Sequence, residues 1–390
     1  MSIDNGRKFL QSLEGIRAYG FLLVFLTHYL PQRFFESGHT PGLAFAARFL
    51  SMTWIGVSMF FVLSGYLIGG ILFETRNRDG YFKVFYSRRA LRVLPLYYLA
   101  LLLVALANSR LGHSIDPRYW WHFLYIQNLI PGYEFSAIAP PPSQIGHLWS
   151  LGIEEQFYLF WPLVVWFVPD RKALLKVTAL LIALCCFARI MAPLGHLSLT
   201  DLYVSTPTRV DAILLGVMLA LIRGEKIYQR LEPFAKYAAL AGIGGVILLI
   251  IATGSAWPRS FFRGALLIPW TNLTAAAIVV AAMETNSVLC RLCSFRWACW
   301  LGKMTYGLYV FHFTYADWFL NYLVPHLSQY VPVVLASAIS ALLAFGLTLL
   351  LAMASFRFIE SPAMNLKDHL KYGTRKEPRR HFVAAWIGQH

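Results

Sequence analysis

Long apolar runs constrain the fold of this 390-residue chain more than any other feature. Hydrophobic residues make up 58% of the sequence and charged residues only 14%, whereas a soluble domain carries about 25% charged residues. A helix needs about 20 apolar residues to cross a bilayer, and runs of that length recur along the chain. The alternating pattern of a membrane β-barrel is not found. The sequence therefore predicts an all-α, polytopic membrane protein.

Ten apolar runs predict ten transmembrane helices. They lie at about 11–30, 50–73, 93–108, 148–168, 173–191, 207–222, 237–254, 262–283, 301–320 and 332–356. A further apolar stretch, 119–130, is too short for a span, which favours an interfacial or re-entrant segment. Which of these two arrangements it takes stays open. Small residues in the second run, such as Gly56 and Gly65, predict close helix packing there.

Lysine and arginine are unevenly divided between alternate loops, and this predicts the orientation. Most of them fall in one set, and the other set holds only Arg33, Arg48, Arg110, Arg118, Arg259 and Arg263. Because cytoplasmic loops carry the excess of positive charge, both termini are predicted to be cytoplasmic. The short polar N-terminus lacks a signal-peptide pattern, so the first run is expected to be a retained span.

The net charge of +15 fits the same interpretation. We attribute it to cytoplasmic loops and to contacts with anionic membrane lipids, and we expect no nucleic-acid partner. The predicted organisation is an integral membrane domain at 1–366 and a basic cytoplasmic tail at 367–390. The expected location is the cell membrane, the inner membrane where there are two.

The first apolar run, Leu13–Tyr29, carries two ionisable residues, Arg17 and His28. They are eleven residues apart, about three helical turns, so both lie on one helix face roughly 16 Å apart. Ionisable groups inside a membrane usually face a bundle interior or a wet cavity, which indicates a functional pair. The alternative is structural: Arg17 would reach the headgroups and His28 would bond to a neighbouring helix.

A second motif places Arg88, Arg89 and Arg92 at the expected start of the third span. Guanidinium groups beside a helix N-terminus form a good phosphate site, because they offer paired hydrogen bonds and the helix dipole adds to them. The alternative is ordinary anchoring by positive charge at the cytoplasmic surface.

A third motif runs from His147 to Tyr158 and places Glu154 and Glu155 near the start of the fourth span. Adjacent helical residues point about 100° apart, so the two glutamates are expected to have different partners. One of them would face a cationic histidine and orient it. The alternative is a structural role for the negative charge near the helix N-terminus.

Three smaller features complete the set of polar candidates. Arg209 and Asp211 open the sixth span, either as a structural ion pair or as polar substrate contacts. His312 shares a helix face with Tyr306 and Tyr309, and a lone membrane histidine is more often a packed residue than a catalyst. The spacing of the cysteines favours free thiols over a metal or redox site, and we expect no metal.

Taken in order along the chain, these motifs resemble the acyltransferase-3 family of membrane O-acyltransferases. The resemblance covers about 9–366 and is carried by Leu13–Arg17 with His28, Gly56–Ile68, Arg88–Pro95, Leu148–Tyr158, Arg209–Ala212 and Phe358–Pro362. There are departures from the family pattern. Ser58 stands where an aspartate is frequent, and His312 lacks a closely following proline. We expect the stand-alone form of the family, without a hydrolase-like domain after the last span.

The resemblance implies transfer of an acyl group, expected to be acetyl, from cytoplasmic acyl-CoA to a hydroxyl of an extracytoplasmic or membrane-associated glycan. His28 is then the best general base, because neutral imidazole titrates near working pH. Glu154 or Glu155 would orient it, and Arg17 would complete the catalytic set. The other expected roles are CoA-phosphate binding by Arg88, Arg89 and Arg92, and substrate contacts by Trp149, Ser150, Arg209, Asp211 and His312.

Neither serine nor cysteine stands out as a nucleophile, so direct transfer is favoured over an acyl-enzyme. The alternative function is a transporter or flippase for a lipid-linked or polar substrate, which intramembrane charge would also suit. Inverted internal repeats would support it, and none is visible in the sequence. A receptor or scaffold would leave the Arg17–His28 pair unexplained. The acyl group, the acceptor and the oligomeric state stay open.

Overall fold

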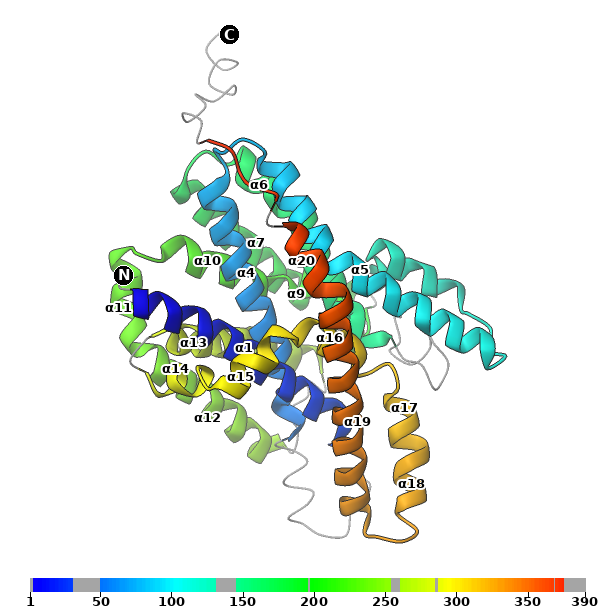
Figure 1. Cartoon of the computed structure of the whole chain (residues 1–390). Coiled ribbons are helices and arrows are strands. Elements are labelled where there is room, and N and C mark those ends of the chain that lie inside the picture. The colour runs from blue at the N-terminus through cyan, green and yellow to red at the C-terminus, as the bar shows by residue number, and fades with distance from the viewer. Residues whose placement is uncertain are drawn as a thin grey trace.

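The computed structural model describes residues 3–30, 50–130, 145–195, 197–253, 260–284, 287–367 and 369–374. These residues form helices and turns without a strand, so the all-α prediction is confirmed for the described chain. The helices longer than ten residues are α1 (Ile3–Tyr29), α4 (Ile55–Thr75), α5 (Tyr81–Arg110), α6 (Trp149–Phe167), α7 (Arg171–Met191), α10 (Asp211–Ile222), α12 (Ala235–Thr253), α13 (Phe261–Met283) and α19 (Val333–Ser355) (Figure 1). The shorter ones are α8 (Leu199–Val204), α9 (Thr206–Arg209), α11 (Lys226–Leu231), α14 (Val288–Cys293), α15 (Arg296–Lys303), α16 (Thr305–Phe311), α17 (Ala316–Trp318), α18 (Val324–Leu327) and α20 (Ser361–Lys367).

Six helical stretches of the described chain are long and apolar enough to cross a membrane. They are Met52–Thr75, Tyr81–Arg110, Arg171–Gly195, Lys226–Ala252, Arg263–Met283 and Val333–Lys367. The chain is therefore a multi-pass membrane protein, while the count of ten spans and the orientation stay predictions. Residues 31–49 and the chain beyond residue 374, which holds most of the expected basic tail, lie outside the described residues.

Helix α4 lies in the middle of the bundle and packs most closely against α10. A Cβ atom added at Gly65 would lie 1.8 Å from the carbonyl oxygen of Ile213, and one added at Gly216 would lie 2.0 Å from that of Val62. Only glycine fits at such distances, so the small residues bring the two backbones together. The packing role expected for Gly65 is therefore confirmed.

The expected span at 301–320 is not one helix, and this prediction was wrong. It divides into α15, α16 and α17, with turns around Met304 and at 312–315. Non-helical backbone at membrane depth is tolerated where surrounding protein buries it, and His312 at the second break is fully buried. Thr305 and Tyr309, which lie on α16 between the two breaks, have buried side chains.

The segment 119–130 forms two short 3-10 helices, Pro117–Leu124 and Gln127–Leu129, as expected of a non-spanning stretch. Hydrogen bonds from a side-chain amide hold this segment against α6: Gln156 Nε2 donates to Asn128 Oδ1 (2.8 Å) and to the Tyr125 carbonyl (2.6 Å). Gln156, in the third motif, therefore has a packing role.

At the start of the same segment, hydrogen bonds from Arg118 hold the pKa of Asp116 below its usual value.

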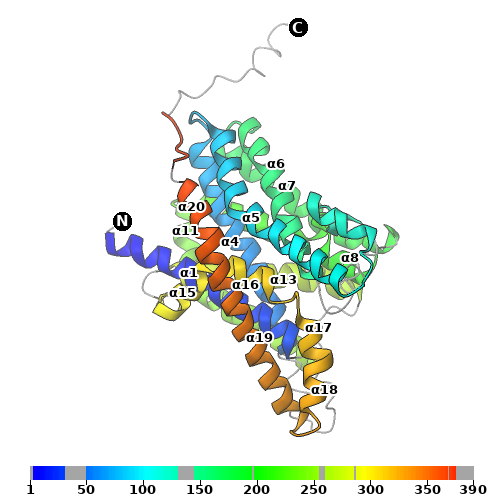
Figure 2. The ribbon, with the colours of Figure 1, turned by 45° about the vertical axis from the view of Figure 1, so that its right-hand side comes forward.

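The C-terminal part has two features, and the second of them contributes to the site. Helix α19 and the neighbouring α17–α18 segment extend beyond the rest of the bundle (Figures 1 and 2). Helix α20 packs against α5, and the chain after it returns to Asp79, whose carbonyl accepts from Gly373 N (3.0 Å). This return places 369–374 beside the arginines of α5.

Candidate active site

The central feature of the bundle is an inner cavity of about 130 Å³ between α1, α4, α5, α6 and α16. It collects charged residues from the Leu13–Arg17, Arg88–Pro95, Leu148–Tyr158 and Phe358–Pro362 motifs. The charged residues that line this cavity are Arg17, Arg89, Arg92, Lys303, Glu154, Glu155 and Glu360. The other lining residues include Ser64, Ser150, Tyr158, Tyr306, Tyr309 and apolar residues of α4. An outer cavity of about 310 Å³ shares Arg17, Arg89 and Arg92 with it and adds Glu14, Arg88, Lys367 and Tyr372. The predicted Arg17 and arginine-motif positions therefore meet at one place.

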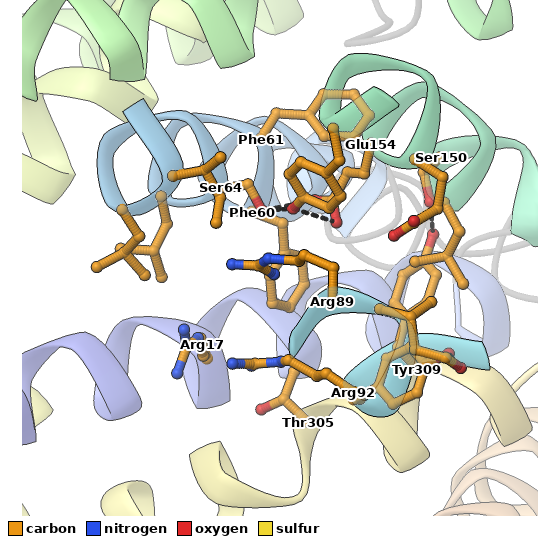
Figure 3. A pocket seen from close by; sticks show the side chains of 18 of the residues that line it. Arg17, Phe60, Phe61, Ser64, Arg89, Arg92, Ser150, Glu154, Thr305 and Tyr309 are labelled. Atoms are coloured by element: carbon orange, nitrogen blue, oxygen red, sulfur yellow. Dashed lines mark hydrogen bonds between the residues drawn. The ribbon is translucent and has the colours of Figure 1, made fainter. Parts of the chain in front are cut away.

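The guanidinium groups of Arg17, Arg89 and Arg92 converge from two helices, α1 and α5 (Figure 3). Arg17 is paired with Glu14 at 2.8 Å, and Arg89 lies over the Tyr158 ring, 4.8 Å from its centroid. Arg92 makes no hydrogen bond or ion pair within the described chain. Two of the three guanidiniums thus have their hydrogen-bond donors available for a ligand.

The helix-dipole part of the phosphate prediction was wrong. Helix α5 begins at Tyr81, so Arg88, Arg89 and Arg92 lie beyond its first turn, where the dipole effect has faded. Arg88 also differs from the other two, because its Nε donates to the Leu370 carbonyl at 2.8 Å. It holds the returning C-terminal segment and lines only the outer cavity.

Glu154 is fixed on the opposite wall from the arginines. Ser64 Oγ donates to its Oε1 (2.9 Å), and the Tyr158 hydroxyl reaches its Oε2 (3.2 Å) and Ser64 Oγ (2.9 Å) (Figure 3). Glu155 also lines the cavity. Neither glutamate contacts His28 in the described structure, so the expected histidine–glutamate pairing was wrong. Both glutamates instead line the cavity that holds Arg17, Arg89 and Arg92.

The inner end of the cavity is formed by Ser150 and Tyr309. Their hydroxyl oxygens are 2.5 Å apart (Figure 3). The Tyr309 hydroxyl also donates to the His147 carbonyl at 3.1 Å. Trp149 is buried beside them but packs against the rings of Phe61 and Tyr203. The predicted Ser150 contact therefore lies on the cavity, and the predicted Trp149 contact does not.

Three histidines lie behind Tyr309, outside the cavity lining. His28 Nδ1 is 3.1 Å from His312 Nε2, and the rings of His147 and His312 are 4.9 Å apart in an edge-to-face contact. The sequence singled out each histidine separately and did not predict that they touch. Nothing in their spacing along the chain reports this contact, because α1, α16 and the turn at 146–148 come together only in the folded bundle.

A second buried group of charges is closed to both cavities. Asp211 pairs with Arg189 at 2.8 Å, and both side chains are almost fully buried. Arg209 is 3.4 Å from Ser58 Oγ and from Asn272 Oδ1. The expected Arg209–Asp211 pair is therefore replaced by Arg189–Asp211. A lone arginine inside an expected span was the signal that would have marked Arg189.

Two further cavity residues, Lys303 and Glu360, were missed as site residues. Glu360 belongs to the last family-like motif, Phe358–Pro362, and its Oε1 accepts from Ser355 Oγ at 3.0 Å. Lys303 ends α15, so its approach to the cavity depends on the broken helix. Among the described residues, no group of three or more His, Cys, Asp or Glu side chains is arranged to hold a metal ion.

Comparison with known proteins gives the family. A model described as an acyltransferase domain matches residues 10–357. The chain belongs to this acyltransferase family. It is 29% identical to the peptidoglycan O-acetyltransferase OatA of Listeria monocytogenes over 91% of this chain and 56% of that protein. It is 26% identical to the O-acetyltransferase OatA of Staphylococcus aureus over 91% of this chain and 57% of the relative.

The acyltransferase chain thus spans little more than half the length of these relatives. No solved structure matches it. The matched region contains both cavities' arginines, Glu154 and the three histidines. Most of the site described above therefore lies within the matched region, and Glu360, Lys367 and Tyr372 follow it.

Proposed function

We propose that this protein is a membrane O-acyltransferase that moves an acetyl group from acetyl-CoA to a hydroxyl of a glycan. The observation that carries the proposal is the arginine-lined pair of cavities inside a domain of the acyltransferase family. The acceptor class is taken from the relatives, one of which is named for peptidoglycan. The acceptor would be a cell-wall glycan or a similar polysaccharide.

The donor phosphates would bind at the outer cavity. Arg89 and Arg92 offer guanidinium donors that no described carboxylate occupies, and guanidiniums bind phosphate through paired hydrogen bonds. Arg17 is added from α1, with Lys367 and Tyr372 from the C-terminal segment. The apolar wall formed by Phe60, Phe61 and Leu63 would then receive the pantetheine arm in the inner cavity.

The reaction would use His28 as general base. His28 removes the proton of the acceptor hydroxyl while the oxygen forms its bond to the acetyl carbon, and the thioester C–S bond breaks. The proton then passes from His28 to the CoA thiolate, which balances the transfer. Tyr309 separates the inner cavity from the histidines, so the donor thioester and the acceptor would meet at this residue.

The orientation in the membrane is a separate part of the proposal. We propose that both termini are cytoplasmic and that the donor binds from the cytoplasmic side. The two ends of α5 test it, because Asp79 and Ser114 flank its 30 residues. After the five native cysteines are replaced, a single cysteine at Ser114 should react with a membrane-impermeant thiol reagent in intact cells. One at Asp79 should react only after permeabilisation. The reverse labelling would overturn the orientation.

The decisive experiment for the function is an ester-formation assay. Purified protein in detergent receives isotopically labelled acetyl-CoA and a panel of glycan fragments, including peptidoglycan fragments, and mass spectrometry detects O-acetyl esters. We expect labelled ester and free CoA in equal amounts. Movement of unmodified substrate across reconstituted vesicles, with no ester formed, would favour the transporter alternative.

A further inference from the structure

The two histidines in contact, His28 and His312, are bonded in a way that defines where their protons lie. His28 lies in the last turn of α1, and His312 follows α16. His312 is fully buried and His28 is half-buried. A second positive charge beside a first is strongly unfavourable in a buried site, so we treat both resting rings as neutral.

The proton on His312 is placed by the backbone. Its Nδ1 lies 2.7 Å from the Tyr309 carbonyl oxygen. A carbonyl oxygen only accepts hydrogen bonds, so Nδ1 must carry the hydrogen. A neutral imidazole has one N–H, and the Nε2 atom of His312 is therefore a lone-pair acceptor.

The proton on His28 follows from that on His312. Since His312 Nε2 accepts, the hydrogen between the rings belongs to His28 Nδ1, 3.1 Å away. The remaining nitrogen of His28, Nε2, then carries the lone pair. This is the atom of His28 that can take a proton from an acceptor hydroxyl.

The surroundings hold the pair in this arrangement. The Tyr29 hydroxyl, next to His28 in the chain, donates to the His312 carbonyl at 2.6 Å. Phe21 contacts the His312 ring edge to face at 5.8 Å, and Phe313 lies 4.5 Å from the His28 ring. His147 closes the remaining side through its edge-to-face contact with His312. These contacts fix the position of α1 relative to the turn that follows α16.

We propose that His312 is a positioning residue that sets the Nδ1–H tautomer and the ring orientation of His28, leaving His28 Nε2 as the proton acceptor. The inference deepens the proposed function and rests on it for the catalytic consequence. Throughout the reaction His312 stays neutral and accepts one hydrogen bond, as a group that orients a catalytic histidine does. The hydroxyl proton enters and leaves at His28 Nε2.

A spectroscopic test needs no substrate. The protein has 11 histidines, and ¹⁵N NMR of histidine-labelled protein distinguishes N–H from lone-pair nitrogens. Signals lost only in His28→Gln belong to His28, and signals lost only in His312→Gln belong to His312. We expect Nδ1–H and a bare Nε2 on both rings at neutral pH. A His28 ring with its hydrogen on Nε2 would overturn the inference, whatever the activity.

Matched substitutions at His312 supply the kinetic test. Glutamine places an amide oxygen where Nε2 lies and still accepts from His28 Nδ1, whereas leucine has similar volume and no acceptor. His312→Leu should lower kcat roughly ten- to a hundredfold with the donor KM unchanged, as loss of an orienting partner does in other sites, and His312→Gln should keep most of the activity. Wild-type kcat in a folded His312→Leu protein would contradict the inference. The expected spectrum in a protein that forms no ester would instead count against the proposed function alone.

Discussion

Two groups of arginines lie inside the same bundle, and only one of them faces a cavity. Arg89 and Arg92 line both cavities with guanidinium donors available. Arg189 and Arg209 are fully buried, and Arg189 is neutralised by Asp211 at 2.8 Å. The open group can exchange water for a ligand, while the closed group can only hold its own helices.

The difference teaches that charge inside a membrane domain is not enough to identify a binding site. Arg89, Arg92 and Arg209 come from prominent motifs, whereas Arg189 does not, and both groups obey the rule that intramembrane charges face the bundle interior. The surroundings separate them: Asp211 pairs with Arg189, and Ser58 and Asn272 contact Arg209, whereas Arg89 and Arg92 face a cavity. We therefore assign ligand binding to the open group and structural support to the closed group.

The largest expected effect lies outside both groups, at His28. His28→Gln keeps much of the side-chain size but cannot take up a proton, so ester formation should fall about 10²–10⁴-fold. The exposed His326 provides the control, and His326→Gln should leave the rate unchanged. The assay is acetyl transfer by purified variants whose folding is checked by thermal melting. Near wild-type transfer by folded His28→Gln would remove His28 from the reaction.

The next largest effect should be on stability, and it tests whether the closed arginine group supports the fold. Asp211→Ala leaves Arg189 buried and unpaired, which should reduce the free energy of unfolding by about 3–5 kcal/mol. The matched control is the half-exposed Arg171–Glu225 pair, where Glu225→Ala should change stability by less than about 1 kcal/mol. Denaturation in detergent measures both. Equal stability of the two variants would mean that the closed group does not support the fold.

The sequence predicted more of the open group than of its surroundings. Arg89 and Arg92 were expected at the donor phosphates, and Arg17 and Glu154 were expected in the catalytic set, because each of these residues interrupts or flanks an apolar helix. Their shared cavity could not be read from the chain, since it depends on how α1, α5 and α6 cross. The same limit explains the missed histidine contact between α1 and the α16 turn.

The sequence also failed to predict where the helices begin and where they are broken. Hydropathy identifies apolar runs but not breaks inside them, so the division of 301–320 at Met304 and at 312–315 was not predicted. The arginine motif was likewise assigned to a helix start because its polar residues precede the apolar run. In the structure α5 extends back to Tyr81, and its first turns are amphipathic.

The central claim, that the open arginines bind the donor, is tested most directly by the affinity for acetyl-CoA. Isothermal titration of purified protein compares wild type with Arg92→Leu, and with Arg230→Leu as an exposed charge-loss control. A charge-assisted phosphate contact is worth about 1.5–3 kcal/mol, so Arg92→Leu should weaken binding roughly ten- to a hundredfold. Arg92→Lys should restore only part of it, because lysine lacks the planar fork, and Arg230→Leu should bind like wild type. Unchanged affinity in a folded Arg92→Leu protein would contradict the account and return this motif to membrane anchoring.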